Sequence, residues 1–229
     1  MKKIAISQSN YIPWKGYFDL INSVDEFVLY DDMQYTKRDW RNRNKIKTKD
    51  GVQWLSIPVE VKGKYFQKIN ETKISDPEWG HNHWATISNS YKKALYFTDY
   101  KDIFEHIYLS NEEKLLSKVN YMFIKTICDI LNIKTLLLGS ESFELLEDRN
   151  ELLMDICKKR DAVEYYSGPA AKSYMDEELF EKKNIKVTYF DYSGYPEYQQ
   201  LYGEFEHAVT ILDLIFNEGP NASKFMKSF

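Results

Sequence analysis

The sequence predicts an α/β protein built on a Rossmann-like, mostly parallel sheet with flanking helices. Short apolar runs with the length of buried strands recur along the chain, and segments with helical spacing separate them. The runs at residues 2–6 and 27–30 enclose a helix that begins at Pro13, and strands joined in this way lie parallel with a right-handed crossover. We expect one domain over residues 1–229, with a small β-rich and helical insertion or peripheral lobe at about residues 53–109.

The first half of the chain continues with less regular elements. A strand is expected at residues 54–59, with the sequence WLSIPV. Short strands or a hairpin around Gly63 are expected at residues 61–69 and 71–74. The pattern from residue 77 to residue 109 then favours helices, which completes the expected insertion.

The second half alternates strands and helices. Ser110 and Glu113 form a capping-box pattern at the start of a long helix, whose apolar stripe ends at Leu131. A helix at residues 208–217, closed by Gly219, ends the series. The expected strands between them are residues 135–138, 163–166 and 185–192, and the expected helices are residues 149–159 and a helix from Ala170.

The composition is that of a globular protein, with 43 % hydrophobic and 29 % charged residues. The net charge of −4 does not favour a general nucleic-acid-binding surface. No apolar run reaches the roughly 18 residues of a membrane span, and the first residues do not resemble a signal peptide, so we expect a cytoplasmic protein. Cys128 and Cys157 lie in apolar helical patterns and are expected to be buried thiols.

Polar residues follow the first strand and lead into the first helix. A strand, a polar turn and a helix start in direct succession often bind a ligand in α/β proteins, because the free N–H groups of the helix suit a phosphate or carboxylate. Gln8, Asn10 and Tyr11 lie in this turn, and Lys15 in the first helical turn is placed to neutralise a phosphate. The alternative is an ordinary loop with a solvent-exposed lysine.

Two acidic residues follow the second strand, at the end where α/β proteins bind ligands. Asp31 and Asp32, with Gln34 beyond them, suit a sugar hydroxyl, an amine or a magnesium ion. Solvated acids in a turn are the alternative. Ser167 and Gly168, after a later strand, offer a weaker second cradle for an anion.

A basic segment comes next, with seven basic residues and one acid between residues 35 and 49. Arg41, Asn42 and Arg43 carry planar donors that suit phosphate, carboxylate or a nucleobase, and Lys37 and Arg38 extend the charge. We interpret the segment as a phosphate-binding arm. A solvated face is the alternative, and nucleic-acid binding is a weaker one.

Among the four histidines, His83 is the candidate general base, because imidazole titrates near neutral pH. His81 and His83 stand two residues apart in a helical pattern, where such side chains do not face each other, so no metal site is expected. The chain has no Walker A, dinucleotide-binding or nucleophile-elbow motif. This disfavours a Ser-His-Asp hydrolase and a dinucleotide-dependent enzyme.

Several longer motifs are similar to one known family. They are QSNYIPWKGYFDLI, DEFVLYDDMQYTKRDWRNRNKIKT, QWLSIPV, EWGHNHW, SYKKALYF, YYSGPAAKSYMD and YPEYQQLYGEFEHAVTILDLIFNEG. In combination they resemble the WbqC-like family over nearly the whole chain. One departure stands out, because relatives usually have His-Gln-Pro where this chain has Ser7-Gln8-Ser9. Any chemistry of that histidine is lost here or is carried by another group, such as His83.

The resemblance implies a place in bacterial gene clusters for O-antigen, the outer part of lipopolysaccharide, and other surface polysaccharides. It further implies acylation or aminoacylation, such as glycylation, of an amino sugar carried on a nucleotide. A distant, local likeness links Asn10–Phe18 to the HxGH loop of nucleotidylyltransferases, with Lys15 and Tyr17 in the places of the two histidines. That likeness implies a related Rossmann-like fold and disfavours ordinary adenylyl transfer.

The leading hypothesis is therefore a transferase of the N-acyltransferase or aminoacyltransferase type. His83 would deprotonate the attacking amine, and Asp32 is the second expected catalytic residue. The acceptor would be a thymidine diphosphate amino sugar, and the acyl donor a carrier-protein thioester or coenzyme A, with no tightly bound cofactor. The expected substrate-binding residues are Gln8, Asn10, Tyr11, Trp14, Lys15, Tyr17, Asp31, Gln34, Lys37, Arg38, Arg41, Asn42, Arg43, Ser167 and Gly168.

Two other functions stay open at this point. One is a nucleotidylyltransferase-like enzyme that uses a nucleoside triphosphate. The other is a non-catalytic subunit that binds a sugar nucleotide and supports another transferase. An acyl carrier protein is the partner expected for the leading hypothesis, and a homodimer is compatible with the sequence.

Overall fold

A five-stranded parallel sheet forms the centre of the protein, as seen in a computed structural model that describes residues 1–229. The strands stand in the order β5-β2-β1-β6-β7, which is 3-2-1-4-5 when they are counted along the chain. This is the doubly wound, Rossmann-like arrangement, so the predicted fold class is confirmed. The strands are β1 (Lys3–Ser7), β2 (Glu26–Leu29), β5 (Leu136–Gly139), β6 (Glu164–Ser167) and β7 (Lys186–Tyr189).

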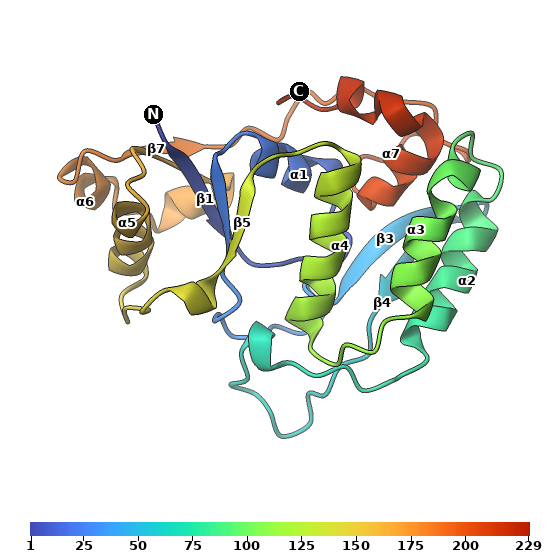
Figure 1. Cartoon of the computed structure of the whole chain (residues 1–229), viewed down its shortest axis with the longest axis horizontal. Coiled ribbons are helices and arrows are strands. Elements are labelled where there is room, and N and C mark those ends of the chain that lie inside the picture. The colour runs from blue at the N-terminus through green and yellow to red at the C-terminus, as the bar shows by residue number, and fades with distance from the viewer.

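Helices cover both faces of this sheet, as Figure 1 shows. Alternate strand residues face opposite sides, so Ile4 and Val28 belong to one apolar cluster and Ala5 and Phe27 to the other. The first cluster includes side chains of α5 and the second those of α1, α4 and α7. The helices named are α1 (Lys15–Asn22), α4 (Leu116–Ile130), α5 (Arg149–Lys159), α6 (Glu177–Glu181) and α7 (Ile211–Glu218).

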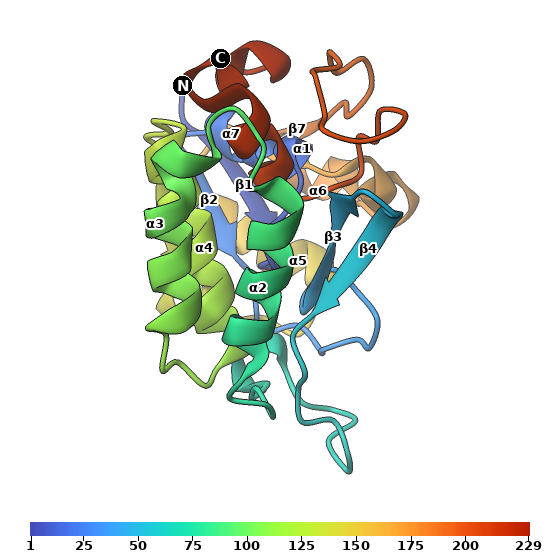
Figure 2. The same ribbon diagram turned by 90° about the vertical axis from the view of Figure 1, so that its right-hand side faces the viewer.

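The long connection between β2 and β5 carries a second group of elements. These are an antiparallel hairpin of β3 (Arg43–Thr48) and β4 (Gly51–Ser56), then α2 (Trp79–Tyr91) and α3 (Phe97–Leu109). Figure 2 shows α2, α3 and α4 beside one another, with the hairpin on the other side of α2. Side chains of the hairpin, of α2 and of α3 join the same apolar cluster as α1 and α4. The division into a domain and a lobe at residues 53–109 stays a prediction.

The expected strands at residues 61–69 and 71–74 are wrong. Residues 57–78 contain only isolated bridges, such as Val59 with Ile74, and a 3₁₀ turn at Ile69–Glu71. The strand expected at residues 54–59 lies a few residues earlier in the sequence, as β4. Its position is set by pairing with β3, which lies in the basic segment. A strand needs a ladder partner, and this segment has none over more than one residue pair.

Several helix starts also differ from expectation, and α7 begins at Ile211 rather than at residue 208. α1 begins at Lys15 rather than Pro13, and Ala170 lies in a 3₁₀ helix at Pro169–Ser173. The capping box at Ser110 is wrong, because α4 begins only at Leu116 and Glu113 Oε1 accepts from the nearby Lys114 and Leu115 N–H groups instead. The Glu113 carboxylate therefore serves the irregular segment that precedes α4.

Several other predictions are confirmed. α5 has the expected bounds, with the Asp148 side chain accepting from the Glu151 N–H as its N-cap. Cys128 and Cys157 are buried free thiols.

No helix combines the length and the apolar character that crossing a membrane requires. Residues 190–210, here called the C-terminal strap, contain no helix or strand and lead into α7, which Gly219 ends with a φ of +50°.

Candidate functional site

The sheet has its topological switch point between β1 and β6, because the chain leaves β1 toward β2 on one side and returns to β6 on the other. A hollow of about 260 Å³ lies at the carboxyl ends of these two strands. Ser7 and Gln8 line it from β1, and Ser167 and Gly168 line it from β6. No atom lies within 4 Å of the position that a Cβ on Gly168 would take. We refer to this hollow as the switch-point crevice.

Arg149 also lines the switch-point crevice, and sequence reasoning missed it. It is the first residue of α5, and its guanidinium lies 4.6 Å from the centre of the Tyr174 ring. A guanidinium at the start of a helix beside a crevice suits a phosphate, because the helix dipole and the fixed cation act together. The sequence did hold a signal, since Asp148-Arg149 marks a capped helix start after a buried strand.

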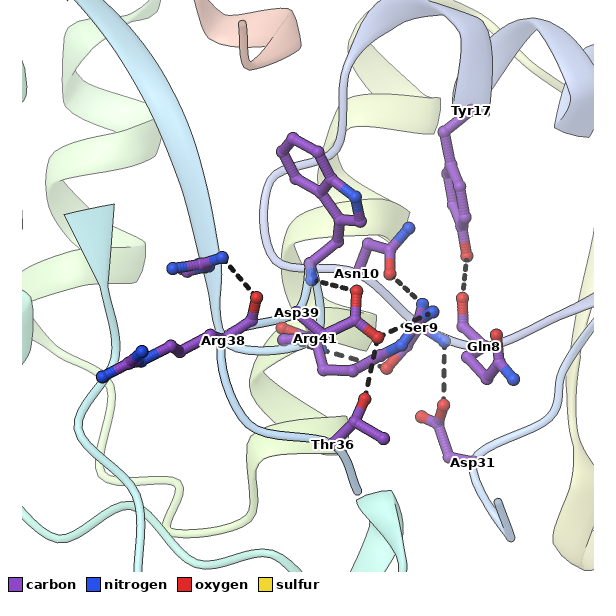
Figure 3. Close-up of polar contacts among 12 residues, drawn as sticks. Gln8, Ser9, Asn10, Tyr17, Asp31, Thr36, Arg38, Asp39 and Arg41 are labelled. Carbon is purple, nitrogen blue, oxygen red and sulfur yellow. Dashed lines mark hydrogen bonds and ion pairs between the residues drawn. The ribbon is translucent and has the colours of Figure 1, made fainter. Parts of the chain in front are cut away.

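The loop after β1 is held by a buried hydrogen-bond network, shown in Figure 3. The Ser9 N–H donates to Asp31 Oδ1 at 2.8 Å, which ties the carboxyl ends of β1 and β2 together. Asn120 on α4 donates through Nδ2 to Ser9 Oγ at 3.0 Å and to the Arg41 carbonyl at 2.9 Å. The basic segment is thereby fixed beside the β1 loop.

Arg41 is the cation of the basic segment that reaches this loop. Its guanidinium donates to Asn10 Oδ1 and lies 3.6 Å from Asp39 Oδ2, with the side chain 14 % exposed. Tyr17 in α1 donates through its hydroxyl to the Gln8 carbonyl at 3.0 Å. The structure thus brings together five of the residues that the sequence singled out, namely Gln8, Asn10, Tyr17, Asp31 and Arg41.

A second and larger hollow, of about 630 Å³, lies beyond the carboxyl ends of β2 and β5. Asp31, Asp32 and Lys68 line it. We call it the acidic hollow. Asp32 Oδ1 lies 3.0 Å from Lys68 Nζ, and Asp32 Oδ2 accepts from Ser140 Oγ at 2.8 Å. The lining also includes Glu71, Glu141 and Lys118, so the hollow holds four carboxylates, and Asp32 has one close cation.

The two carboxyl groups differ in their proton affinity. Burial raises the pKa of Asp31 above its usual value, although the Ser9 N–H opposes this. Burial acts in the same direction on Asp32, but hydrogen bonds from Lys68 and Ser140 outweigh it and hold the pKa of Asp32 below its usual value. Asp31 is therefore the better proton acceptor, and Asp32 is the better fixed negative charge.

His83 does not lie at this edge, and its geometry argues against a general base. Its Nε2 lies 3.2 Å from the Ser56 carbonyl, which can only accept, so Nε2 carries the proton. Its Nδ1 lies 2.8 Å from the Tyr11 hydroxyl and accepts from it. Burial lowers the pKa of His83 to about 4, so the ring is neutral at pH 7. Both nitrogens are occupied, and His83 and Tyr11 position the loop.

Lys15 is also placed differently from the expectation. Its Nζ donates to the Pro196 carbonyl of the C-terminal strap at 2.8 Å and lies 5.1 to 5.7 Å from three aromatic ring centres. The residue is 3 % exposed, and burial lowers the pKa of its amine to about 8. Lys15 fixes the strap instead of meeting a ligand. Counted back from Gly16, the first histidine of the HxGH pattern corresponds to Trp14 rather than Lys15.

The rest of the basic segment spreads over several environments. Gln34, Lys37 and Arg38 are exposed, and Gln34 Nε2 donates to the Tyr65 carbonyl at 2.7 Å. Asn42 Nδ2 donates to the Ile57 carbonyl at 2.8 Å, and Arg43 lies over the Trp54 ring. The segment is not one continuous phosphate-binding arm. No three His, Cys, Asp or Glu side chains lie together in a way that would hold a metal ion.

Comparison with known proteins found a matching family and a similar protein. The sequence profile of the WbqC-like protein family matches residues 8–225. A Mycobacterium tuberculosis protein named "Uncharacterized protein Rv1507c" is 51 % identical over 227 residues, which is 99 % of this chain and 98 % of that protein. No solved structure shows significant similarity.

Proposed function

The chain belongs to the WbqC-like protein family, and from its sheet-edge site we propose that it transfers an acyl or aminoacyl group, such as glycyl, to the amine of a nucleotide-linked amino sugar. A role in O-antigen or other surface-polysaccharide synthesis is part of the proposal. The supporting geometry is that of a site for a two-part ligand, with an anionic part and an amine-bearing part.

One observation carries the proposal, namely that two hollows flank the carboxyl end of β2. Tyr30 and Met33 line the switch-point crevice, whereas Asp31 and Asp32 line the acidic hollow. Neighbouring residues of one short segment therefore face two separate spaces. A nucleotide diphosphate with an attached amino sugar has two parts of matching character, because the phosphates seek cations and the amine seeks carboxylates.

The switch-point crevice is the place we assign to the nucleotide diphosphate. Open α/β sheets bind ligands beyond the carboxyl ends of the strands at such a switch point. Arg149 supplies a cation at a helix start, and Ser167 and Gly168 end a strand beside it. Arg41, held near the β1 loop by Asn10, adds positive charge beside that loop.

The acidic hollow is the place we assign to the amine and to its reaction. Asp32 binds the amine as a fixed negative charge, and Asp31 accepts a proton from it. The amine nitrogen then attacks the carbonyl carbon of the activated acyl group. The new C–N bond forms as the bond from carbon to the leaving group breaks, and the leaving group departs with the electron pair, as a thiolate when the donor is a thioester. The proton that nitrogen loses as the amide forms is taken up by the departing thiolate, because Asp31 already holds the first one.

The test incubates the protein with a thymidine diphosphate 4-amino sugar and acyl or aminoacyl donors, and detects products by mass spectrometry. We expect a mass increase equal to one acyl group on the sugar nucleotide. Arg149→Ala should weaken sugar-nucleotide binding by about 10- to 150-fold, the range for one lost charge-assisted hydrogen bond. Arg160→Ala is the matched control, because Arg160 pairs with Glu26, which lies three residues before the end of β2.

Two results would contradict the proposal. The first is the absence of any calorimetric binding of amino-sugar nucleotides. The second is binding without a product for every donor tested, which would favour the accessory-subunit alternative.

A nucleotidylyltransferase-like reaction is the second candidate, favoured by the strand order and by the place of the β1–α1 loop. The positions of the two loop histidines hold Trp14 and Tyr17, and the Tyr17 hydroxyl is already bonded to the Gln8 carbonyl. This reaction would release pyrophosphate from a nucleoside triphosphate in the presence of magnesium. A coupled pyrophosphate assay distinguishes it from acyl transfer.

A further inference from the structure

A third hollow lies on the β1–α1 loop and plays no part in the reaction proposed above. Its volume is about 220 Å³, and its lining residues are Asn10, Pro13, Trp14, Trp40, Asn44 and Ala208. Sites that enclose a whole small ligand occupy roughly 300–1,000 Å³. This hollow therefore suits one ring-sized group of a larger ligand. We call it the tryptophan hollow.

The Trp14 side of the tryptophan hollow is held in place by packing. The indole lies over the first turn of α1, where a Cβ on Gly16 would come within 2.3 Å of Trp14 Cζ2, so only glycine permits this position. Tyr192 and Tyr195 of the C-terminal strap pack against the indole, each with its ring centre 5.5 Å away. The Trp14 ring is thus fixed without a ligand.

The Trp40 side is fixed through its backbone and remains open to solvent. The Trp40 carbonyl accepts from the Tyr11 N–H at 3.0 Å. The Trp40 ring lies 5.3 Å from the Trp54 ring, and each residue is 40 % exposed. Exposed indoles beside a hollow are typical of surfaces that stack flat rings, because the ring offers a large apolar face.

The β1–α1 loop adopts a strained conformation just before Trp14. Ile12 is fully buried and has a φ of +36°, which a β-branched residue rarely adopts. Asn44 holds it there by donating through Nδ2 to the Tyr11 and Ile12 carbonyls, at 3.1 and 2.8 Å. Strain that the surroundings enforce in this way is common at ligand sites, where it pre-organises the geometry.

Positive charge lies beside Trp54, the neighbour of Trp40, although the whole chain has a net charge of −4. The Arg43 guanidinium lies 4.1 Å from the Trp54 ring centre, and Lys45 Nζ lies 5.4 Å from it. Arg43 Nε is buried and has no hydrogen-bond partner. Arg43 Nη2 donates to the Arg38 carbonyl, and a guanidinium stacked on an exposed indole suits an anionic ligand.

We propose that the tryptophan hollow binds the nucleobase of a phosphorylated nucleotide, with the phosphates toward Arg43 and Lys45. This is a second ligand site, separate from the switch-point crevice, and it does not depend on acyl transfer. In a two-substrate enzyme this nucleotide belongs to the donor. Coenzyme A and acyl adenylates share this chemistry, since both carry an adenine nucleotide.

Tryptophan fluorescence during titration with adenosine diphosphate, coenzyme A and adenosine tests the proposal. Adenosine diphosphate and coenzyme A should quench the emission saturably, and adenosine should bind more weakly because it lacks phosphate. Trp40→Leu should weaken adenosine diphosphate binding by about 5- to 150-fold, the effect of losing one base–aromatic stack. Arg43→Gln should weaken binding of the diphosphate but not of adenosine. Tighter binding of coenzyme A than of the diphosphate identifies coenzyme A as the source, and the reverse order identifies an adenylate.

Phe66→Leu is the control, because Phe66 is an 82 % exposed aromatic residue that does not line the hollow. Circular dichroism shows whether each variant is folded. The proposal is overturned if none of the three compounds quenches saturably, or if Trp40→Leu binds as the parent does. It is also overturned if Arg149→Ala abolishes the binding and Trp40→Leu preserves it. Failure of the acyl-transfer proposal appears separately, as a missing mass increase with intact fluorescence quenching.

Discussion

The two halves of the β1–α1 connection behave differently, although both are rich in residues that can bind a ligand. Gln8, Ser9 and Asn10 lie at the open sheet edge and contact Asp31 and Arg41. The following residues turn inward, where Tyr11 bonds to His83 and Lys15 bonds to the C-terminal strap. Gln8 and Asn10 are therefore available to a ligand at the sheet edge, whereas Tyr11 and Lys15 anchor the fold. Residue type alone does not distinguish these roles, whereas burial and occupied donors do.

The largest expected effect comes from Asp31, at the open half. Asp31→Asn should lower turnover by about 10²- to 10⁴-fold, the usual contribution of a general base. The variant should stay folded, because the Asn side-chain oxygen can still accept from the Ser9 N–H. Rates of acyl-sugar formation are compared at equal concentrations of folded protein. Asp129→Asn, on the exposed face of α4, is the control, and equal rates for all three proteins would refute the assignment.

The next largest effect is a loss of stability at acid pH, and it depends on the buried His83. The folded-state pKa of His83 is lowered to about 4 from 6.5, so the unfolded state binds more protons between these values. The free energy of unfolding should therefore fall by up to about 3 kcal/mol as the pH drops from 6.5 to 4. Urea unfolding of the parent and of His83→Gln, across this window, measures the difference. Parallel pH profiles would show that His83 is not buried as a neutral ring.

A smaller effect is expected from Tyr11, next to His83. Tyr11→Phe leaves His83 Nδ1 and the Tyr108 hydroxyl without their shared partner, at 2.8 and 2.7 Å in the parent. This should cost about 1–2 kcal/mol in the free energy of unfolding and leave sugar-nucleotide binding unchanged. Thermal unfolding measures the loss of stability, and calorimetry measures the binding of the sugar nucleotide. A loss of binding with normal stability would place the Tyr11 hydroxyl at the ligand.

The last effect is a change in stability at alkaline pH, and it depends on Lys15. Its folded-state pKa of about 8 lies below the ordinary 10.5, so the unfolded state again binds more protons between these values. The free energy of unfolding should rise by about 1–2 kcal/mol from pH 8 to pH 10.5, relative to Lys15→Met. Chemical unfolding of both proteins across this range measures the difference. If the free energies of unfolding of the two proteins differ by the same amount at every pH, the Lys15 amine is solvated.

The sheet and most helices follow from local pattern. Buried strands such as β2 and the capped helix α5 show their periodicity and caps within a few residues. The errors arose where distant contacts decide the outcome. Lys15 meets a carbonyl 181 residues away, and Tyr11 meets His83 72 residues away. No spacing within the first helix reveals that a distant strap covers it.

The site was predictable in the same uneven way. The carboxyl ends of β1, β2 and β6 could be placed once parallel strands were recognised, which brought Gln8, Asp31 and Ser167 to one edge of the sheet. The basic segment could not be resolved from sequence, because only the hairpin register and Asn120 decide that Arg41 faces the β1 loop and Arg43 faces Trp54.

The most direct test is a crystal structure of the protein soaked with a thymidine diphosphate 4-amino sugar. The account predicts the diphosphate in the switch-point crevice between β1 and β6, within hydrogen-bond distance of Arg149, and the sugar amine at Asp31 and Asp32. It also predicts Lys15 still bonded to the Pro196 carbonyl and His83 still bonded to Tyr11. A diphosphate bound at the start of α1 by a released Lys15, or an amine placed against His83, would contradict the division of the connection into an open and an anchoring half.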